Sequence, residues 1–408
     1  MTIGIDASRA NLKHRTGTEW YSFYLIKNLA KIDKKNHYVL YVNKEINSDL
    51  QKLVKDNSNF RFKLLKWPFK SFWTLGRLSL EMLFHKPDVL FVPAHALPFF
   101  SPKKTVNTIH DLAFFRDSHL YRLEKYNSRR SINKFFVNLL VKIITLGKYK
   151  ASSLDYLYWS TNFALKKASD IITVSHFSKK EILNFFPKAS SEKIKVIHNG
   201  YNSDIYKKIN DSEKIEEVLK KYGIEKPFYL YVGRLEKKKN TPLLIEAMSI
   251  LKENCPNIQE KLLLIGNASY GYDEVKYVIE EYNIEKDIVM PGWIDEEDMP
   301  SIFSAATAFV FPTKYEGFGI PVLQAMACQL PCLVSNIDVL KEVADNAAIY
   351  FDQNDSIAIA EAMRKIVEDK ELREELIING QKRIKCFSFE KCAMETLFIL
   401  EEGGKSND

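Results

Sequence analysis

The chain has 408 residues, of which 46% are hydrophobic and 27% charged, and its net charge at pH 7 is +7. The composition is typical of a folded globular protein, and the length exceeds one ordinary hydrophobic core and fits two domains. No apolar run reaches the roughly 18 residues that span a bilayer, and the start, MTIGIDASRA, lacks the basic and long apolar segments of a signal peptide.

Short β-branched runs alternate with amphipathic stretches along the first 200 residues. Strands are predicted for TIGID, YVLYV, VLFVP, TVNTIH, IITVS and KVIHNG. This alternation predicts a parallel sheet with helices on both faces. The polar, turn-rich segment HNGYNSDIYKKINDSEK then marks a boundary near residue 200.

The same pattern repeats in the second half of the chain. Strands are predicted for FYLYVGR, KLLLIG, DIVMPG, AFVFPT, PCLVS and AIYF. Their continuous apolar character favours strands that are buried on both faces. The predicted fold class is therefore α/β, with two Rossmann-like doubly wound domains at residues 1–200 and 201–385.

The two halves differ in charge. Residues 1–200 hold 34 lysines and arginines against 15 aspartates and glutamates, a net charge of +19, whereas residues 201–408 hold 25 against 37, a net charge of −12. A basic domain favours an anionic partner such as nucleic acid or anionic lipid. The alternative is an uneven solvated surface without a partner. No nucleic-acid-binding module is visible, so we expect no nucleic acid.

One candidate anion site lies in VGRLEKKKN, directly after a predicted strand. Gly233 permits a tight turn, and the Arg234 guanidinium suits phosphate oxygens. Lys237–Lys239 precede a helix expected near Thr241, where cations are unfavourable unless an anion is bound. The alternative is a solvated basic turn.

A second candidate site lies in EGFGIPVLQAM. Gly317 and Gly319 allow close approach of the backbone to a ligand at the start of a helix expected near Pro321. The Glu316 carboxylate can accept hydrogen bonds from sugar hydroxyls, and the Gln324 amide can bond a diol. The alternative is a helix-start charge and a surface amide.

In the first half, two further strand exits carry candidate residues. Gly17 opens a helix after the first strand, and His110 with Asp111 follows the strand TVNTIH. A histidine at a strand end is often only a capped core residue, and an aspartate there is often a helix cap.

The quoted motifs, with MPGWIDEEDMPSIFSAATAFVFPTKYEGFGIPVLQAMAC and ASDIITVSHFSKKEI, resemble the retaining glycosyltransferases of family 4. The resemblance covers most of residues 1–400. Within the family, the chain resembles the bacterial polysaccharide mannosyl- and rhamnosyltransferases. This resemblance implies the GT-B architecture, two Rossmann-like domains facing across a cleft, with a C-terminal helix at 386–408 returning to the first domain.

The resemblance also implies roles for single residues. Arg234 and Lys239 would grip the donor diphosphate, and Glu316 the donor sugar. Backbone N–H groups at Phe318, Gly319 and Ile320 would assist Glu316. From the first domain, Gly17 would lie near the diphosphate and His110 beside the sugar. Trp293 would lie near the base, and Gly233 and Gly317 complete the donor loops.

Gln324 departs from the family signature, which has a glutamate for the ribose hydroxyls at this place. An amide still bonds a hydroxyl but loses charge assistance of about 1 kcal/mol. The substitution fits a natural variant, an introduced change or an inactive relative. Because the other motif residues are intact, a working enzyme is favoured, and a nucleotide-sugar-binding subunit with little or no activity is the alternative.

The expected donor is a nucleotide sugar, GDP-mannose rather than a UDP-sugar, and the expected acceptor is a glycan or lipid-linked hydroxyl. A metal-dependent sugar transferase would carry Asp-x-Asp after an apolar strand, whereas DEED at 295–298 lies in a polar loop. The five cysteines form no C-x-x-C pair. We therefore expect no metal and no cofactor.

Residues 133–150, NKFFVNLLVKIITLGKYK, predict an interfacial helix with a narrow polar stripe that includes Lys134, Lys142 and Lys148. The alternative is a core helix with one wet edge. The segment WPFKSFW at 67–73 would add an aromatic and basic patch. Anionic lipid attracts surface cations by ~1 kcal/mol each, so we expect a cytoplasmic protein peripheral to the inner face of the plasma membrane.

Overall fold

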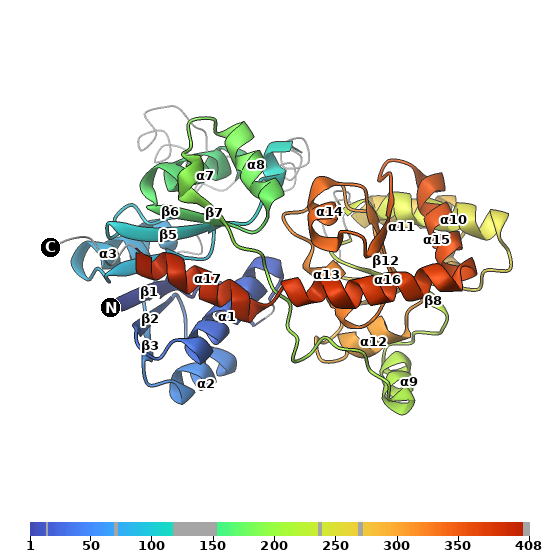
Figure 1. The fold of residues 1–408 in the computed structure, drawn as a ribbon, viewed down its shortest axis with the longest axis horizontal. Helices are drawn as coiled ribbons and strands as arrows, with labels where there is room; N and C mark the ends of the chain where they lie inside the picture. The colour runs from blue at the N-terminus through green and yellow to red at the C-terminus, as the bar shows by residue number, and fades with distance from the viewer. Residues whose placement is uncertain (14, 69–71, 117–152, 236–238, 268–271, 403–408) are drawn as a thin grey trace. The chain divides into compact units, whose positions relative to one another are not determined.

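The computed structural model describes residues 1–13, 15–68, 72–116, 153–235, 239–267 and 272–402 (Figure 1). The chain forms two compact units. The first is Met1–Gly200 with Phe389–Asp408, and the second is Tyr201–Ser388. The domain boundary predicted at residue 200 coincides with this division, and the C-terminal return begins at Phe389, three residues later than the predicted 386.

The first unit contains a parallel sheet in the order β3-β2-β1-β4-β5-β6-β7. Its strands are β1 (Thr2–Asp6), β2 (His37–Val42), β3 (Phe60–Leu64), β4 (Val89–Val92), β5 (Lys104–Ile109), β6 (Asp170–Thr173) and β7 (Ile194–Val196). Sequence analysis missed β3, whose sequence FRFKL lacks the continuous apolar character of the others. As an edge strand it tolerates the exposed charges that a central strand would exclude.

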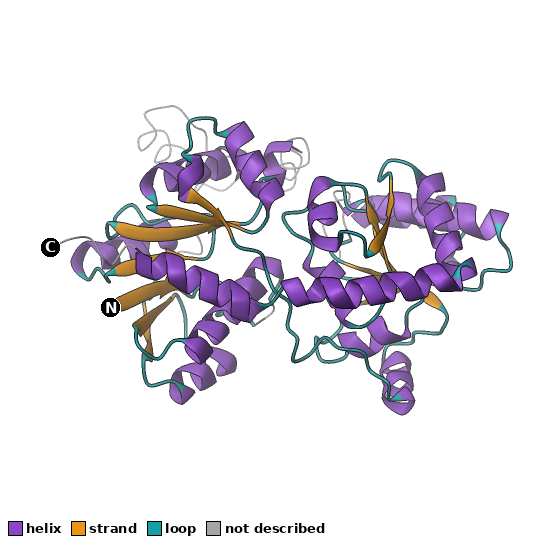
Figure 2. Ribbon diagram, in the orientation of Figure 1, coloured by secondary structure: helices purple, strands orange, loops and turns teal. Residues whose placement is uncertain are grey.

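Helices cover both faces of this sheet (Figure 2). They are α1 (Gly17–Ile32), α2 (Ser48–Asp56), η1 (Thr74–Leu78), α3 (Ser79–Phe84), α4 (Ala113–Arg116), α7 (Ser153–Lys167), α8 (His176–Phe185), η2 (Ser191–Lys193) and α17 (Phe389–Glu402). Helix α17 packs against α1. The Tyr24 and Phe389 rings lie 5.1 Å apart at this contact, so the end of the chain completes the core of the first unit.

The second unit contains a six-stranded parallel sheet in the order β10-β9-β8-β11-β12-β13. Its strands are β8 (Phe228–Val232), β9 (Lys261–Ile265), β10 (Ile288–Gly292), β11 (Ala308–Phe311), β12 (Cys332–Ser335) and β13 (Ala348–Phe351). Its helices are α9 (Ser212–Lys221), α10 (Thr241–Asn254), α11 (Tyr272–Glu281), η4 (Glu285–Asp287), α12 (Met299–Ala305), α13 (Ile320–Ala327), α14 (Asp338–Ala344), α15 (Ser356–Glu368), α16 (Lys370–Arg383) and η5 (Ile384–Cys386).

Strand order reverses once in each sheet. The chain runs outward from β1 through β2 to β3 and then starts again at β4; in the second unit it runs from β8 to β10 and starts again at β11. Ligands of open parallel sheets bind at the carboxyl ends of strands beside such a reversal. The predicted class of two Rossmann-like α/β domains is confirmed, and each unit has a place for a ligand.

Two findings bear on the membrane expectation. Among the helices of the described residues, none combines the length and the apolar character that a bilayer span requires. The expectation of a surface patch at 67–73 is wrong for Trp73. This residue is buried and donates its indole N–H to the Leu65 carbonyl oxygen at 2.9 Å. Trp67 packs half-buried against the same core, whereas Phe72 is exposed. Lys134, Lys142 and Lys148 lie outside the described residues.

Candidate functional site

The exits of β8 and β11 form one site in the second unit, because these strands are neighbours at the strand reversal. The β8 exit leads through Gly233 and Arg234 to α10, and the β11 exit leads through Glu316 to α13. Both exits carry the residues that sequence analysis selected. Sequence position alone separates them by about 80 residues, and the sheet brings them together.

Gly233 is confined by its neighbours at the end of β8. Its N–H donates to the Ile265 carbonyl oxygen at 3.0 Å, and a Cβ would lie 2.7 Å from the Tyr231 hydroxyl. The following Arg234 is exposed, and its guanidinium makes no hydrogen bond or ion pair with any described residue. A free planar cation at a strand exit is available to bind an anionic ligand.

Lys239 and Glu316 form an ion pair between the two exits. Both side chains are half-buried, and the Lys239 Nζ lies 5.9 Å from the centroid of the Phe311 ring. The anion expected for the basic turn is thus supplied in part by the protein itself. An anionic ligand at this place would share Lys239 with Glu316 or displace it, so the two residues respond to one ligand together.

Asn240 holds the start of α10 in place. Its backbone is left-handed, with φ 61° and ψ 27°, a conformation that asparagine tolerates better than most residues. Its buried side-chain Nδ2 donates to the carbonyl oxygens of Pro312 at 3.1 Å and Gln353 at 2.6 Å. The residue after Lys239 therefore ties together the loops that follow β8, β11 and β13.

Gly319 is the N-cap of α13 and has a φ of 104°, which favours glycine. A Cβ there would lie 2.9 Å from Cδ2 of Leu340. Pro321 occupies the first turn of the helix, where its missing N–H costs nothing. The helix starts at Ile320, one residue before the predicted start, so its N-terminus lies at the exit that carries Glu316.

Gln324 lies half-buried on α13, and no hydrogen bond of its side-chain amide to another described residue is found. Trp293 is exposed and follows Gly292 at the exit of β10. Strand β10 lies two places from β8, which is about 10 Å at the usual strand spacing. Gln324 thus lies on the helix that begins at the exit carrying Glu316, whereas Trp293 lies further along the same edge of the sheet.

His110 is buried at the exit of β5 in the first unit, and its ring meets Tyr21 edge to face at 4.6 Å. Burial, together with nearby His95, lowers the pKa of His110 to about 4, so the ring is neutral at pH 7. Its Nε2 lies 3.1 Å from the Pro93 carbonyl oxygen, which can only accept. We therefore assign the proton to Nε2, which leaves Nδ1 as an acceptor for a hydroxyl group.

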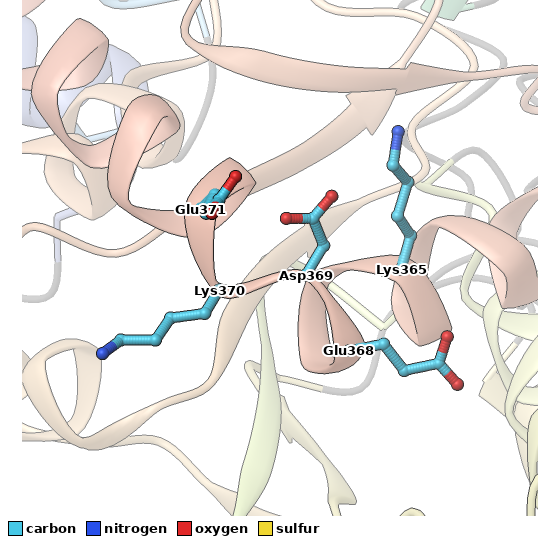
Figure 3. Close-up of a pocket in the computed structure, with 5 residues that line it drawn as sticks. All are labelled: Lys365, Glu368, Asp369, Lys370 and Glu371. Atoms are coloured by element: carbon cyan, nitrogen blue, oxygen red, sulfur yellow. The ribbon is translucent and has the colours of Figure 1, made fainter.

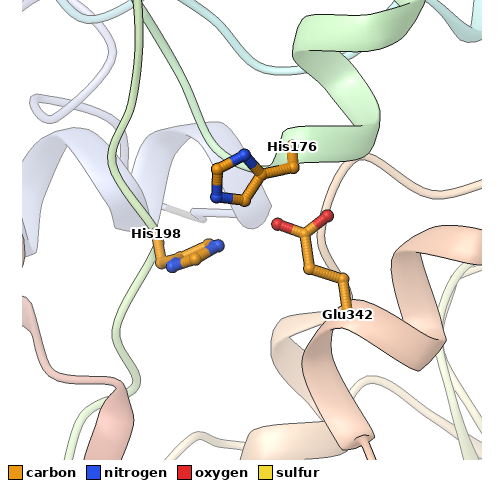
Figure 4. Close-up of side chains that lie close together, drawn as sticks. All are labelled: His176, His198 and Glu342. Atoms are coloured by element: carbon orange, nitrogen blue, oxygen red, sulfur yellow. The ribbon is translucent and has the colours of Figure 1, made fainter.

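His110 belongs to a row of histidines that sequence analysis did not recognise. His95, His110, His176 and His198 follow β4, β5, β6 and β7, which are consecutive neighbours in the sheet. The rings of His176 and His198 lie 5.7 Å apart (Figure 4). The signal was present in the sequence, since each of four predicted strands either contains a histidine near its end or is followed by one within two residues.

Two other predicted residues have clear local roles. Gly17 is the first residue of α1 and is exposed, and a Cβ there would meet no atom within 4 Å. Thr16 and Glu19 form a capping box around this start. The Asp111 carboxylate accepts the Ala113 N–H at 3.0 Å, which is the helix cap that sequence analysis offered as an alternative.

A pocket elsewhere in the second unit does not coincide with this site. It lies at the turn between α15 and α16 and is lined by Lys365, Glu368, Asp369, Lys370 and Glu371, whose side chains point in different directions (Figure 3). Asp369 accepts the Leu372 N–H to cap α16, and Glu368 pairs with Arg364. The charges of this pocket serve the two helix ends.

Two Rossmann-like units, with a lysine and a glutamate paired at the strand reversal of the second, make up the framework of a GT-B glycosyltransferase. Residues 212–383 match the family model of glycosyl transferases group 1, and residues 15–205 match that of glycosyltransferase family 4. The chain belongs to this glycosyltransferase family, as the sequence motifs predicted.

Known relatives include several sugar transferases. The chain is 32% identical to O-antigen chain mannosyltransferase B of Escherichia coli over 259 residues, 63% of this chain and 67% of that one. It is 24% identical to the serotype-specific mannosyltransferase WbdA of the same species over 303 residues. That match takes in 74% of this chain but only 33% of WbdA, so the chain spans about a third of WbdA's length.

Solved structures share the fold. Sucrose-phosphate synthase from Thermosynechococcus elongatus superposes with a TM-score of 0.72 at 18% identity, with all of both chains covered. HepE from Anabaena, in complex with UDP-glucose, superposes with a TM-score of 0.68 at 17% identity and covers 99% of each chain. At these identities the likeness concerns the fold.

Proposed function

We propose that this protein transfers mannose from GDP-mannose to a hydroxyl group of a glycan or lipid-linked acceptor, with retention of the anomeric configuration. The observation that carries the proposal is the Lys239–Glu316 pair at the strand reversal, together with the exposed Arg234 at the β8 exit. The mannosyltransferases among the relatives favour mannose, and the family membership favours a nucleotide-sugar donor. The HepE complexes with UDP keep a UDP-sugar as the second candidate.

The proposed reaction proceeds on one face of the sugar. The bond between the anomeric carbon and the diphosphate oxygen breaks, and the acceptor oxygen bonds to the same face of that carbon. The acceptor proton passes to the departing phosphate oxygen. A double displacement would need a carboxylate on the opposite face, and Glu316 is assigned instead to the sugar hydroxyls.

Charge stabilisation of the leaving diphosphate would supply most of the rate enhancement. Arg234, Lys239 and the N-terminus of α13 are the groups for this role. When the diphosphate takes Lys239, the Glu316 carboxylate is released toward the sugar hydroxyls. The neutral His110 ring can accept a hydroxyl hydrogen bond at Nδ1. We expect turnover without a divalent cation.

The acceptor is proposed to be a growing surface polysaccharide on the inner face of the plasma membrane. The support is the +19 charge of residues 1–200 and the polysaccharide enzymes among the relatives, including the capsular polysaccharide glycosyltransferase CapM of Staphylococcus aureus, which is 30% identical over 250 residues, 60% of this chain and 64% of CapM. Anionic lipid would attract this half of the chain. The predicted interfacial helix at 133–150 remains a proposal.

The test measures sugar transfer by the purified protein from GDP-mannose and from UDP-sugars. Arg234→Ala should lower kcat by about 10²-fold or more, because one stabiliser of the leaving group is removed. Arg364→Ala is the matched control, since Arg364 is also partly exposed in the same unit and pairs with Glu368 one turn along α15. Near-normal turnover of Arg234→Ala would refute its role. Binding of nucleotides by the wild type without any turnover would favour a binding subunit.

A further inference from the structure

Helix α3 turns an apolar stripe to solvent in the first unit. Leu80, Leu83 and Phe84 are all exposed, and their spacing of three and four residues places them on one face of the helix. Phe84 is 74% exposed, whereas Leu78 and Met82 are fully buried. A single exposed leucine is ordinary, but three large apolar side chains in one stripe indicate an interaction surface.

Phe100 extends the stripe. The Ser79 hydroxyl accepts the N–H of Phe99 at 2.8 Å, so the loop that holds the exposed Phe100 lies at the start of α3. In the sheet register Val89 is opposite Lys104, so the segments that precede β4 and β5 are neighbours at the amino-terminal edge of the sheet. We call Leu80, Leu83, Phe84 and Phe100 the amino-edge patch.

Most of the charged side chains near this patch are cations. The buried Glu81 carboxylate, 4% exposed, pairs with Lys63 and with Arg77, whose Nη1 lies 3.3 Å away. Burial alone would raise the pKa of Glu81, but hydrogen bonds and charges from Lys63 and Arg77 lower it. The carboxylate therefore stays ionised and holds two cations beside the patch. Lys86 and Lys103 are exposed just before β4 and β5, and in the same segment the exposed Asp88 carboxylate accepts the Thr2 N–H at 2.6 Å.

We propose that the amino-edge patch docks on an anionic lipid bilayer. Phe84 and the leucines would enter the headgroup region, and the surrounding lysines and arginine would meet lipid phosphates. Charge complementarity favours lipid, because an apolar stripe edged with cations matches an apolar layer edged with anions. Only the purpose of this docking, access to a lipid-linked acceptor, rests on the proposed function. The residues that make the contact are ones that sequence analysis did not select.

The same unit provides its own control surface. Met394 and Phe398 are exposed four residues apart on α17, and Phe398 is 62% exposed. The charged side chains around this pair are Glu395, Glu401 and Glu402, with one lysine, Lys391, which pairs with Glu395 at 3.9 Å. Apolar exposure is thus similar on α3 and α17, but the surrounding charge is opposite, so an anionic bilayer should distinguish the two surfaces.

The experiment is co-sedimentation of the full chain with vesicles of phosphatidylcholine alone and of phosphatidylcholine with one-third phosphatidylglycerol. The wild type should bind the anionic vesicles only, and added salt should weaken the binding. Phe84→Glu should lower the partition coefficient by about tenfold or more, which is the loss of one buried phenylalanine. Phe398→Glu should bind as the wild type does. Both positions are exposed, and thermal unfolding checks that both variants keep the fold.

Three results would overturn the inference. Phe84→Glu could bind anionic vesicles as tightly as the wild type, or the wild type could bind neutral vesicles equally well. Light scattering without vesicles could also reveal a dimer that Phe84→Glu abolishes, which would make the patch an interface between two copies. Transfer to a water-soluble acceptor is measured in parallel. If the wild type transfers no sugar to that acceptor, the proposed function is refuted, whereas the conclusion about vesicle binding is unaffected.

Discussion

Asn240 is a residue whose role follows from its contacts, and we expect it to position Lys239. Asn240→Gly keeps the left-handed backbone but removes the bonds to Pro312 and Gln353. The start of α10 is then no longer fixed to the loop after β11. The expected result is a KM for the donor raised by about thirtyfold, from the loss of two hydrogen bonds of about 1 kcal/mol each, with a smaller change in kcat.

Asn283→Gly is the control for that variant. Asn283 also has a positive φ, 51°, and lies in the same unit, but it is exposed and its amide makes one bond, at 3.5 Å, to Glu281. It should leave the donor KM unchanged. If Asn240→Gly shifts the melting temperature and leaves KM at the wild-type value, Asn240 is structural only.

At the residue scale, the sequence selected candidate residues at the strand exits but did not predict their partners. Arg234, Lys239 and Glu316 could be selected because each follows a strand and suits an anion or a sugar. That Lys239 pairs with Glu316 could not be predicted, because the pairing depends on β8 and β11 being neighbours across a strand reversal. His95, His176 and His198 were missed, because they form one row only through the order of β4 to β7 in the sheet.

Three neighbouring strands in the second unit end at glycines, and their backbones approach closely there. The Gly233 N–H donates to Ile265, and the Gly266 N–H donates to Gly292 at 3.2 Å. Gly266 has a φ of 149°, and a Cβ there would overlap the Gly233 carbonyl oxygen. The start of the candidate site therefore depends on a contact that only glycine allows.

Gly266→Ala should destabilise the second unit by more than about 2 kcal/mol, because backbone atoms block the new methyl group and the φ is strained. The measurement is thermal unfolding. Gly17→Ala is the control, because its Cβ meets no atom within 4 Å. A Gly266→Ala protein with wild-type stability would contradict the described backbone contact.

Whole strands were predictable where burial on both faces made them continuously apolar. All twelve predicted strands are present, and the one missed, β3, is the edge strand with exposed charges. Helix starts were predictable within a residue at Gly17, Thr241 and Ile320, because each carries a cap or a proline signal. The burial of Trp73 was not predictable, because its hydrogen bond to the Leu65 carbonyl oxygen depends on tertiary structure.

At the scale of the molecule, the first unit is built from two distant parts of the chain. Helix α17 contributes Phe389, Ala393 and Leu400 to the core around α1, although it follows the last helix of the second unit. Removal of residues 389–408 should therefore destabilise the first unit and spare the second. Thermal unfolding should show the transition of the first unit fall by several degrees, with GDP binding to the second unit retained.

An unchanged melting temperature of the first unit in the truncated chain would contradict this prediction. Adding residues 389–408 as a separate peptide should restore stability to the first unit in part. The domain boundary near residue 200 could be predicted from a polar, turn-rich segment. The return of the chain at Phe389 came from family resemblance, because no local signal in the sequence says which core a terminal helix completes.

The amino-edge patch and His110 lie at opposite ends of the same strands. Strand β5 runs from Lys104, beside the patch, to Ile109, just before His110, and six residues of strand measure about 20 Å. A protein resting on the bilayer through α3 would hold the exit of β5 that far above the lipid surface. The first unit would then set the distance between the lipid surface and the β5 exit. Acceptors with only one or two sugars on their lipid would be too short to reach, and the enzyme would elongate chains that others had started.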